Sequence, residues 1–330
     1  MGQVGQVGQV GRESPDPLGL NYGMPIARCL AARAVLSIVC AATLIGSPQA
    51  PSAPILQQPQ TIPLWPNGAP GALGDEDADK PSITIYMPSN TSGRMTAVIL
   101  APGGSYAHLS MNLEGREPAN YLNALGLAAF VLQYRLGPRY HHPIQLGDVQ
   151  RAIRLVRSHA GEWHLAGDRT GIMGFSAGGH LASLASTRFD AGDAVAGDAV
   201  DRVSSRPDFA ILAYPVISFA EAWTHQASKK NLLGDDPDPA LARSLSTDTQ
   251  VTAQTPPTFL FHTSADTTVP VDNSIHYFLA LRAAGVPAEL HVFKEGRHGS
   301  GLGLQDPALA EWPALLANWL RSSGFLARFD

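Results

Sequence analysis

The residue best placed to do chemistry in this sequence is Ser176, at the centre of Gly-Phe-Ser-Ala-Gly at residues 174–178. Apolar residues precede this pentapeptide, and small residues compatible with a helix follow it. Gly174 and Gly178 stand where a side chain would collide if a strand turned sharply into a helix, so they permit a turn that exposes the hydroxyl. The pattern predicts a nucleophile elbow at Ser176. A Gly/Ser turn without a catalytic role has the same short pattern and is the alternative.

A serine hydroxyl is a weak nucleophile at neutral pH, so a base must take its proton and a third group must orient that base. In α/β enzymes with such an elbow, the acid and then the histidine follow the serine along the chain. Asp266 follows an apolar run at residues 258–262, and His298 lies in a Gly-rich loop after the run at residues 288–293. The sequence therefore predicts Ser176 as nucleophile, His298 as base and Asp266 as orienting acid.

Other acidic and histidine residues compete for these roles, but each fits a structural role better. Asp272 is predicted to cap a helix, because Asp-x-x-Ser at a helix start satisfies free amides. Asp148 is predicted to be a helix cap or a hydrogen-bond acceptor, and His180 is predicted to pack in the core. His262 is expected inside an apolar strand, and His291 is expected at a solvated or core position of another strand.

Acyl transfer also needs hydrogen-bond donors for the negative charge that develops on the carbonyl oxygen. The amide of Ala177, directly after the nucleophile, is one predicted donor. Pro-Gly-Gly-Ser-Tyr at residues 102–106 follows an apolar run, and the amides of Gly104 and Ser105 are predicted to complete this oxyanion hole. A plain turn at residues 102–106 is the alternative.

The elements that must position these residues alternate between apolar runs and helical patterns. Strands are predicted at residues 83–87, 96–101, 127–134, 170–175, 209–214, 258–262 and 288–293, and helices at about 116–125, 146–160, 272–284 and 308–320. Several runs are apolar on both faces, as in the centre of a parallel sheet. The alternation predicts an α/β fold with a doubly wound, mostly parallel sheet and a site at the carboxyl ends of the strands.

Three stretches interrupt this alternation. Residues 60–80 are rich in Pro, Gly and Asp and are predicted to form an irregular loop. Residues 190–201 repeat Ala, Gly, Asp and Val and are predicted to be a surface loop. Residues 218–257 are longer than a usual connection, which suits a small cap insertion over the site.

Residues 1–53 are predicted to be a leader ahead of a single domain at residues 54–330. Residues 24–53 are first basic, then apolar, then small and Pro-rich, which is the order of a secretory signal peptide. The apolar run at residues 34–46 is short for a spanning helix, which needs about 20 residues. We therefore expect a secreted or periplasmic protein with no stable membrane partner after cleavage; an uncleaved anchor or a lipid on Cys40 is the alternative.

Composition excludes several classes of function. The chain has 330 residues, 45% of them hydrophobic and 15% charged, which is enough to bury a large core. The net charge of −5 and the absence of a basic run argue against a nucleic-acid partner. Cys29 and Cys40 both lie in the leader, so the domain is expected to have no thiol nucleophile, disulfide or thiolate metal site. With no His-x-x-x-His or His-x-Asp cluster near the elbow, we expect neither a metal nor another cofactor.

Longer motifs surround the predicted site residues. They are Pro-Gly-Gly-Ser-Tyr at 102–106, Glu-Gly at 114–115, Tyr-Arg-Leu at 134–136, Ala-Ile-Arg-Leu-Val-Arg at 152–157, Gly-Phe-Ser-Ala-Gly-Gly-His at 174–180, Asn-Leu-Leu-Gly at 231–234, Thr-Pro-Pro-Thr-Phe at 255–259 and Gly-Arg-His-Gly at 296–299. Together they resemble the secreted bacterial esterases of the α/β-hydrolase superfamily that are related to acetyl xylan and feruloyl esterases. The similarity runs from about residue 62 to about residue 320.

This resemblance implies a serine esterase that acts on acetyl or other acyl esters of plant polysaccharides without a cofactor. The triad positions of the family match Ser176, Asp266 and His298, and its oxyanion hole matches Gly104, Ser105 and Ala177. Relatives usually carry Gly where Ser105 stands, so a positive φ at this position would place the serine under strain.

The sequence thus predicts a serine carboxylic ester hydrolase with a small-molecule or oligosaccharide ester as its substrate. A serine peptidase of the prolyl-oligopeptidase type shares the elbow and the order of the triad, but such enzymes carry a large propeller domain, and no repeat of that length precedes residue 81. A catalytically silent carbohydrate-binding or partner-binding module on a hydrolase scaffold is the other alternative.

Overall fold

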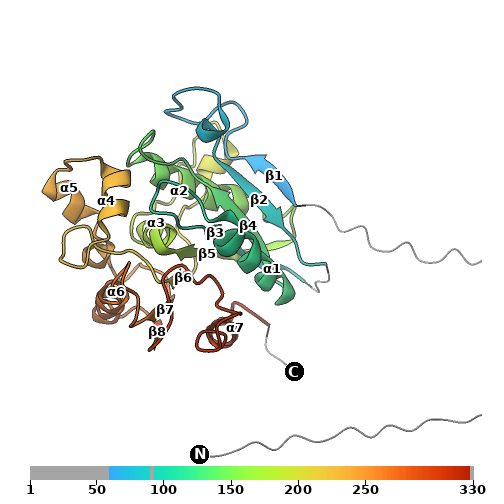
Figure 1. Cartoon of the computed structure of the whole chain (residues 1–330). Coiled ribbons are helices and arrows are strands. Elements are labelled where there is room, and N and C mark those ends of the chain that lie inside the picture. Colours follow the sequence, from blue (N-terminus) through green and yellow to red (C-terminus); the bar gives the residue numbers. More distant parts are fainter. Residues whose placement is uncertain (1–58, 90–92, 328–330) are drawn as a thin grey trace, which may run out of the picture. The chain divides into compact units, whose positions relative to one another are not determined.

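The computed structural model describes residues 59–89 and 93–327, and within them a sheet in the order β1-β2-β4-β3-β5-β6-β7-β8 forms the centre (Figure 1). The strands are β1 Gln60–Pro63, β2 Ser82–Tyr86, β3 Met95–Ala101, β4 Ala128–Gln133, β5 Leu165–Phe175, β6 Ala210–Ala213, β7 Thr258–Thr263 and β8 Ala288–Phe293. The strands from β4 to β8 in this order are parallel, whereas β2 runs antiparallel to β4 and β1 antiparallel to β2. The prediction of a mostly parallel, doubly wound α/β sheet is confirmed.

The central strands are buried on both faces, as their apolar runs predicted. In β3, Ile99 packs into a cluster on one face of the sheet, and its neighbour Val98 packs into a second cluster on the other face. The helices α2 Ile144–Ser158, α3 Ser176–Thr187 and α6 Asp272–Ala283 cover the first face, and α1 Glu117–Ala124 and α7 Trp312–Ser322 cover the second (Figure 1). Two helical layers therefore enclose the sheet and leave the carboxyl ends of its strands to carry loops.

One predicted loop contains a strand, so that prediction is wrong in part. Residues 60–80 begin with β1, whose Ile62 lies opposite Ile83 of β2. This short edge strand is mostly exposed, so it lacks the apolar alternation that would reveal it, and its main-chain bonds to β2 hold it in place. At the other end of the chain, α7 begins at Trp312 rather than near residue 308, because turns occupy residues 307–311.

The two irregular stretches after β5 differ in structure. Residues 190–198 form a largely exposed loop, as predicted, but a 3-10 turn follows at Ala199–Arg202. Arg151 anchors this stretch through ion pairs with Asp198 and Asp201 at 2.5 and 2.9 Å. Residues 218–257 contain the helices α4 Gln226–Leu233 and α5 Pro239–Ser244, followed by a 3-10 turn at Thr247–Gln250. The role of this insertion as a cap over the site stays a prediction.

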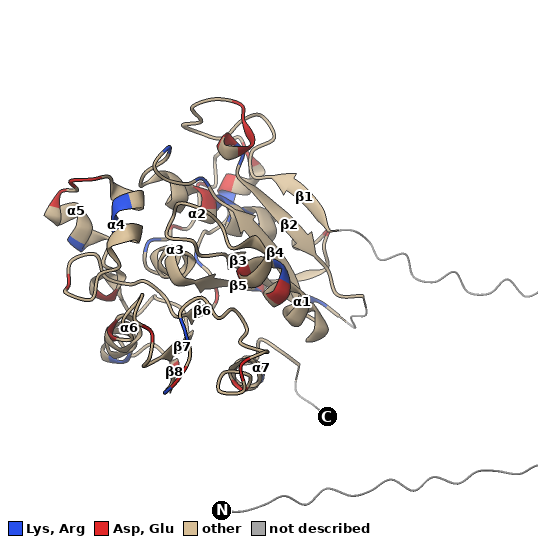
Figure 2. Ribbon diagram, in the orientation of Figure 1, with Lys and Arg blue, Asp and Glu red and all other residues tan. Residues whose placement is uncertain are grey.

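Charged residues are spread over many elements (Figure 2). In the described ranges, no helix is both long enough and apolar enough to cross a membrane. The predicted leader at residues 1–53 lies outside the described residues, so the expectation of an exported protein stays a prediction.

Candidate active site

The turn that joins β5 to α3 holds Ser176 in a conformation that most residues avoid. Ser176 has a φ of 52°, in the left-handed region. A Cβ on Gly174 would lie 2.2 Å from the carbonyl oxygen of Gly178, and a Cβ on Gly178 would lie 2.0 Å from that of Ala101. Only glycine fits at these two positions. The chain therefore makes the sharp strand-to-helix turn that the sequence predicted.

The structure brings Ser176, His298 and Asp266 together in one chain of hydrogen bonds. Ser176 begins α3, Asp266 follows β7, and His298 follows β8, so all three lie at the carboxyl edge of the parallel sheet. The Oγ of Ser176 lies 2.8 Å from Nε2 of His298, and Nδ1 of His298 lies 2.6 Å from Oδ2 of Asp266. This is the geometry that a base-activated serine nucleophile requires.

The Asp266 carboxylate is held from several sides. Its Oδ1 accepts the amides of Thr268 and Val269, each at 2.9 Å. Burial alone would raise the pKa of Asp266, but hydrogen bonds from His262 and His298 and from the Val269 amide hold it well below its usual range. A charged Asp266 accepts the proton on Nδ1 of His298, which leaves Nε2 free to accept the hydroxyl proton of Ser176.

The predicted oxyanion loop passes directly beside the nucleophile. A Cβ on Gly103 would lie 2.9 Å from the Cβ of Ser176. Gly104 and Ser105 have φ values of 131° and 57°, and their amides donate to no acceptor in the described part of the chain. The amide of Ala177 lies in the first turn of α3, where helix amides have no partner within the helix. Among the described residues, three amides without an acceptor thus come from the two segments that flank the serine.

The insertion at residues 218–257 contacts this oxyanion loop. Nδ2 of Asn231, in α4, donates to the carbonyl oxygen of Ser105 at 2.9 Å. A Cβ on Gly137 would lie 2.1 Å from the carbonyl oxygen of Asn231, so the main chains of α4 and the loop after β4 touch. Burial lowers the pKa of His225, the charge of His298 lowers it further and that of Asp266 opposes the shift, so the start of α4 lies within electrostatic reach of the triad.

The competing histidines take structural positions. His180 is fully buried, with Nδ1 2.8 Å from the Tyr106 hydroxyl and Nε2 2.8 Å from the carbonyl oxygen of Leu245. His262 is also fully buried and contacts Ser274 through Nδ1 at 2.7 Å.

His291 lies in β8, with Nε2 2.6 Å from Oε1 of Glu289. Asp148 accepts hydrogen bonds from the guanidinium group and the main-chain amide of Arg135. It therefore acts as a buried hydrogen-bond acceptor, which was one of its two predicted roles. For Asp272 the predicted cap is wrong, because α6 begins at Asp272 itself, and the capping position before it belongs to Val271, which makes no side-chain cap.

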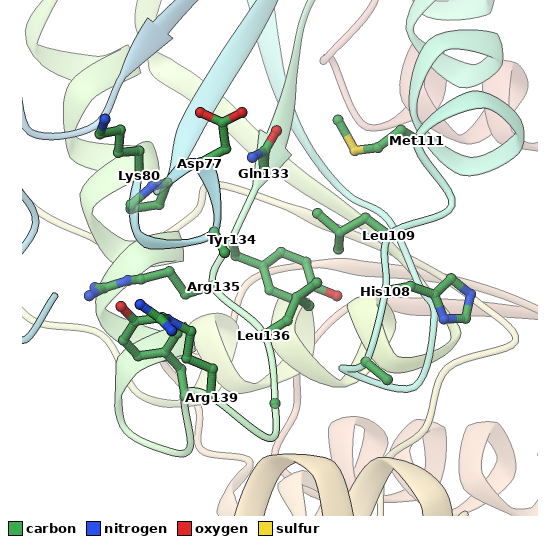
Figure 3. A pocket seen from close by; sticks show the side chains of 15 residues that line it. Asp77, Lys80, His108, Leu109, Met111, Gln133, Tyr134, Arg135, Leu136 and Arg139 are labelled. Atoms are coloured by element: carbon green, nitrogen blue, oxygen red, sulfur yellow. The ribbon is translucent and has the colours of Figure 1, made fainter. Parts of the chain in front are cut away.

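A cavity of about 510 Å³ lies next to the oxyanion loop. It opens between residues 77–81, 107–111 and 133–140, at the carboxyl end of β4. Figure 3 shows His108 and Leu109 on one side of it and Arg139 on the other. Because β3 alone separates β4 from β5, the cavity is on the order of 10 Å from the elbow.

The side chains of His108 and Gln133 line this cavity without a hydrogen-bond partner among the described residues. They supply polar groups, whereas Leu109, Met111 and Leu136 supply apolar surface. Such a lining fits a ligand that presents both hydroxyl groups and apolar faces.

Sequence reasoning gave no role to Glu114, Tyr214 and Asn231, which contact the loops of the site. Glu114 and Asn231 lie within motifs that carry the resemblance to esterases. Tyr214 directly follows β6 and so lies at the carboxyl edge of the sheet, and this position is the signal that could have identified it.

The parallel sheet, the elbow and the order of serine, acid and histidine define an α/β-hydrolase. The BD-FAE family matches residues 83–281, and the chain belongs to this family. The resemblance to acetyl xylan esterase-like members of the superfamily is thereby confirmed.

Among curated proteins, the chain is 39% identical over 258 residues to an acetylxylan esterase of Xylanibacter ruminicola, with 76% of this chain and 50% of that protein covered. It is 34% identical over 224 residues to endo-1,4-beta-xylanase B of Butyrivibrio fibrisolvens, with 66% and 34% covered. The chain thus spans half or less of the length of these two relatives.

Among solved structures, an acetyl ester-xyloside bifunctional hydrolase from Caldicellulosiruptor lactoaceticus is 44% identical, with a TM-score of 0.78 and coverage of 83% of this chain and 100% of that one. A thermophilic esterase from Thermogutta terrifontis is 26% identical, with a TM-score of 0.65 and coverage of 82% and 94%.

Proposed function

We propose that this protein is a serine ester hydrolase that removes acetyl or other acyl groups from xylan-type polysaccharides or oligosaccharides. The observation that carries the proposal is the hydrogen-bonded chain from Ser176 Oγ through His298 to Asp266. Beside it lie the amides of Gly104 and Ser105, which have no acceptor among the residues that the structure describes. This arrangement matches the chemistry of acyl transfer through a serine nucleophile.

In the first half of the reaction, Ser176 Oγ attacks the ester carbonyl carbon while Nε2 of His298 takes the hydroxyl proton. The carbonyl oxygen becomes an oxyanion, which the amides of Ala177, Gly104 and Ser105 stabilise; one such donor contributes about 3 kcal/mol. When the tetrahedral intermediate collapses, the bond to the alcohol oxygen breaks, and His298 gives its proton to that oxygen. Asp266 stabilises the imidazolium that exists between these two transfers.

In the second half, a water molecule attacks the acyl group on Ser176, and His298 takes a proton from that water. Collapse of the second intermediate releases the carboxylic acid and returns the proton to Ser176 Oγ. Every proton taken up by His298 is given back, so the triad ends in its starting state.

Two observations support a carbohydrate ester as the substrate. The relatives of this chain include an acetylxylan esterase, and a solved structure with 44% identity is named an acetyl ester-xyloside bifunctional hydrolase. In addition, His108 and Gln133 line the cavity beside apolar side chains and have no hydrogen-bond partner in the described part of the chain. The cavity lies at a distance that a sugar chain bound at Ser176 can reach.

The test compares wild type with Ser176→Ala on an aryl acetate, on acetylated xylan and on feruloylated xylan. We expect wild type to release acetate, and kcat to fall roughly ten-thousand-fold or more in the variant. Turnover of a Pro-containing aminoacyl anilide in place of the esters would favour a peptidase. Binding to xylan without turnover of any ester would favour a silent module, and loss of activity on chelation would favour a metal-dependent hydrolase.

A further inference from the structure

Glu114 is a buried carboxyl group for which the proposed mechanism has no use. It lies in the wide helical turn Met111–Arg116, directly after the oxyanion loop, and its side chain is almost completely buried, with 3% of the residue exposed. Within residues 59–89 and 93–327, no basic side chain forms an ion pair with it. A buried carboxylate is costly unless hydrogen bonds replace its water, so its partners must explain its presence.

Those partners join the two loops on either side of Ser176. Oε2 of Glu114 accepts the amide of Gly103 at 2.8 Å, and Oε1 accepts the hydroxyl of Tyr214 at 2.9 Å. The hydroxyl oxygen of Tyr214 in turn accepts the amide of Gly301 at 2.9 Å. Gly103 precedes the candidate oxyanion amides, and Gly301 lies in the loop that carries His298. One chain of hydrogen bonds therefore runs from one half of the site to the other.

The direction of each bond favours the charged form of Glu114. Because Gly301 donates to the oxygen of Tyr214, the proton of Tyr214 is free for Glu114, and the amide of Gly103 is a donor as well. Both carboxyl oxygens thus accept, and a proton on either one would face a donor. Burial raises the pKa of Glu114 above its usual value, and the bonds from Tyr214 and Gly103 offset that rise only in part.

Tyr214 also touches the candidate base. Its ring meets that of His298 edge to face, with 5.1 Å between the ring centroids and 68° between the planes. Tyr214 is buried and has a φ of 38°, so surrounding contacts hold it in a conformation that it would otherwise avoid. Any movement of its hydroxyl away from Glu114 therefore moves the surface on which the His298 ring rests.

We propose that Glu114 is a positioning residue for acyl transfer. Acting through Gly103 and Tyr214, it holds the oxyanion loop and the His298 ring at fixed positions relative to Ser176. The inference rests on the proposed function, because it concerns the same site. Glu114 does not contact the reacting atoms, and its contribution lies in geometry that matters most in the transition state.

The first test is Glu114→Gln, which keeps the size of the side chain but replaces one acceptor oxygen with a donor group. Either Gly103 or Tyr214 then loses its acceptor. We expect kcat on an aryl acetate to fall at least about tenfold while KM stays within about threefold, because the lost interaction acts in the transition state. The matched control is Glu117→Gln, an exposed glutamate of the neighbouring helix α1, which should keep wild-type kcat and KM.

A second measurement separates positioning from stability. A trifluoromethyl ketone forms a tetrahedral adduct with the serine and places an oxyanion in the hole. Its Ki should rise in Glu114→Gln by about the same factor as kcat/KM falls, because such an adduct resembles the transition state. A purely structural role would lower the melting temperature and leave kcat and Ki of the folded enzyme unchanged.

Tyr214→Phe provides the variant that keeps the carboxylate. It leaves the bond from Gly103 in place, so we expect a smaller loss of kcat, about three- to tenfold, with a matching rise in Ki. The double variant should lose little more than Glu114→Gln alone, since the two side chains act as one unit.

The outcomes are decisive in either direction. A folded Glu114→Gln with wild-type kcat and Ki overturns the proposal for Glu114 and leaves the esterase proposal intact. If that variant does not fold, Tyr214→Phe decides, and wild-type kcat and Ki in it overturn the proposal. A wild-type enzyme with no turnover of any ester overturns both proposals, and Glu117→Gln then shows the same absence.

Discussion

Oδ2 of Asp266 lies 2.6 Å from Nδ1 of His298, and the other oxygen of the same carboxylate accepts two main-chain amides. The loop after β7 therefore fixes the carboxylate without help from the imidazole. As a result, Asp266 presents a rigid acceptor to His298. The tautomer of His298 depends on whether Oδ2 of Asp266 accepts a hydrogen bond from Nδ1.

Asp266→Asn should separate this chemical role from any structural role. An amide nitrogen facing His298 would donate to Nδ1 and place the ring proton on Nε2, where it blocks proton transfer from Ser176. We expect kcat on an aryl acetate to fall about ten-thousand-fold. The exposed Asp272 allows a matched Asp→Asn control with unchanged kinetics. A kcat within tenfold of wild type in Asp266→Asn would contradict the assigned role.

Ser105→Gly should stabilise the protein, because Ser105 has a φ of 57°, which glycine adopts without strain. The relief of strain exceeds the entropy cost of glycine by about 0.5–1 kcal/mol, which corresponds to about 1–3 °C in melting temperature. The amide that serves the oxyanion is retained, so kcat should stay within about twofold. Ser105→Ala keeps the strained φ and is the control; an equal rise in melting temperature for alanine would exclude backbone strain as the cause.

Asn231→Ala tests whether the insertion at residues 218–257 supports the oxyanion loop. The variant loses the 2.9 Å hydrogen bond to the carbonyl oxygen of Ser105, a bond that contributes on the order of 1 kcal/mol. We expect kcat to fall about three- to tenfold, as the loop becomes less well ordered. Gln226→Ala removes an exposed amide side chain from the same helix and should have no effect. Identical kinetics for the two variants would show that the contact is dispensable.

His180 should make the fold sensitive to acid. Burial lowers its pKa from the usual 6.5 to about 4. The unfolded chain binds a proton at His180 below about pH 6.5, whereas the folded protein does so only near the lower value, so stability is lost as the pH falls through this window. Between pH 7.5 and pH 5 this histidine should reduce the free energy of unfolding by about 2 kcal/mol.

Urea unfolding of wild type and His180→Gln at the two pH values measures this effect. The variant should be less stable at pH 7.5, because it loses the contacts with Tyr106 and Leu245. It should nevertheless lose less stability on acidification than wild type does. Equal losses in the two proteins would assign the acid sensitivity to other groups.

The sequence predicted the residues whose position follows from a strand. Ser176, Asp266 and His298 each come directly after an apolar run or in the loop that it leads into, and parallel strands bring their carboxyl ends to one edge. The order of the sheet and the antiparallel start at β1 could not be predicted in the same way, because a short exposed edge strand has no apolar period.

Glu114 and Asn231 escaped prediction for a different reason. A glutamate in a helical turn and an asparagine on a short helix look like solvated residues in the sequence. Their roles depend on Tyr214 and Ser105, which are distant along the chain and become partners only in the folded protein. The predicted cap at Asp272 failed because the boundary of α6 lies one residue away from the expected one, and capping depends on that single position.

The close contacts of Gly103 and Gly178 make the geometry of the reacting groups independent of the residues that select the substrate. Gly178 packs on the main chain of residue 101, and Gly103 packs on the Cβ of Ser176, with no longer side chain between them. The spacing between the nucleophile and the candidate oxyanion amides is therefore set by backbone atoms. Changes in the cavity walls or in residues 218–257 can alter which ester fits while this spacing stays constant, so substrate preference is free to diverge among relatives that share the same reaction.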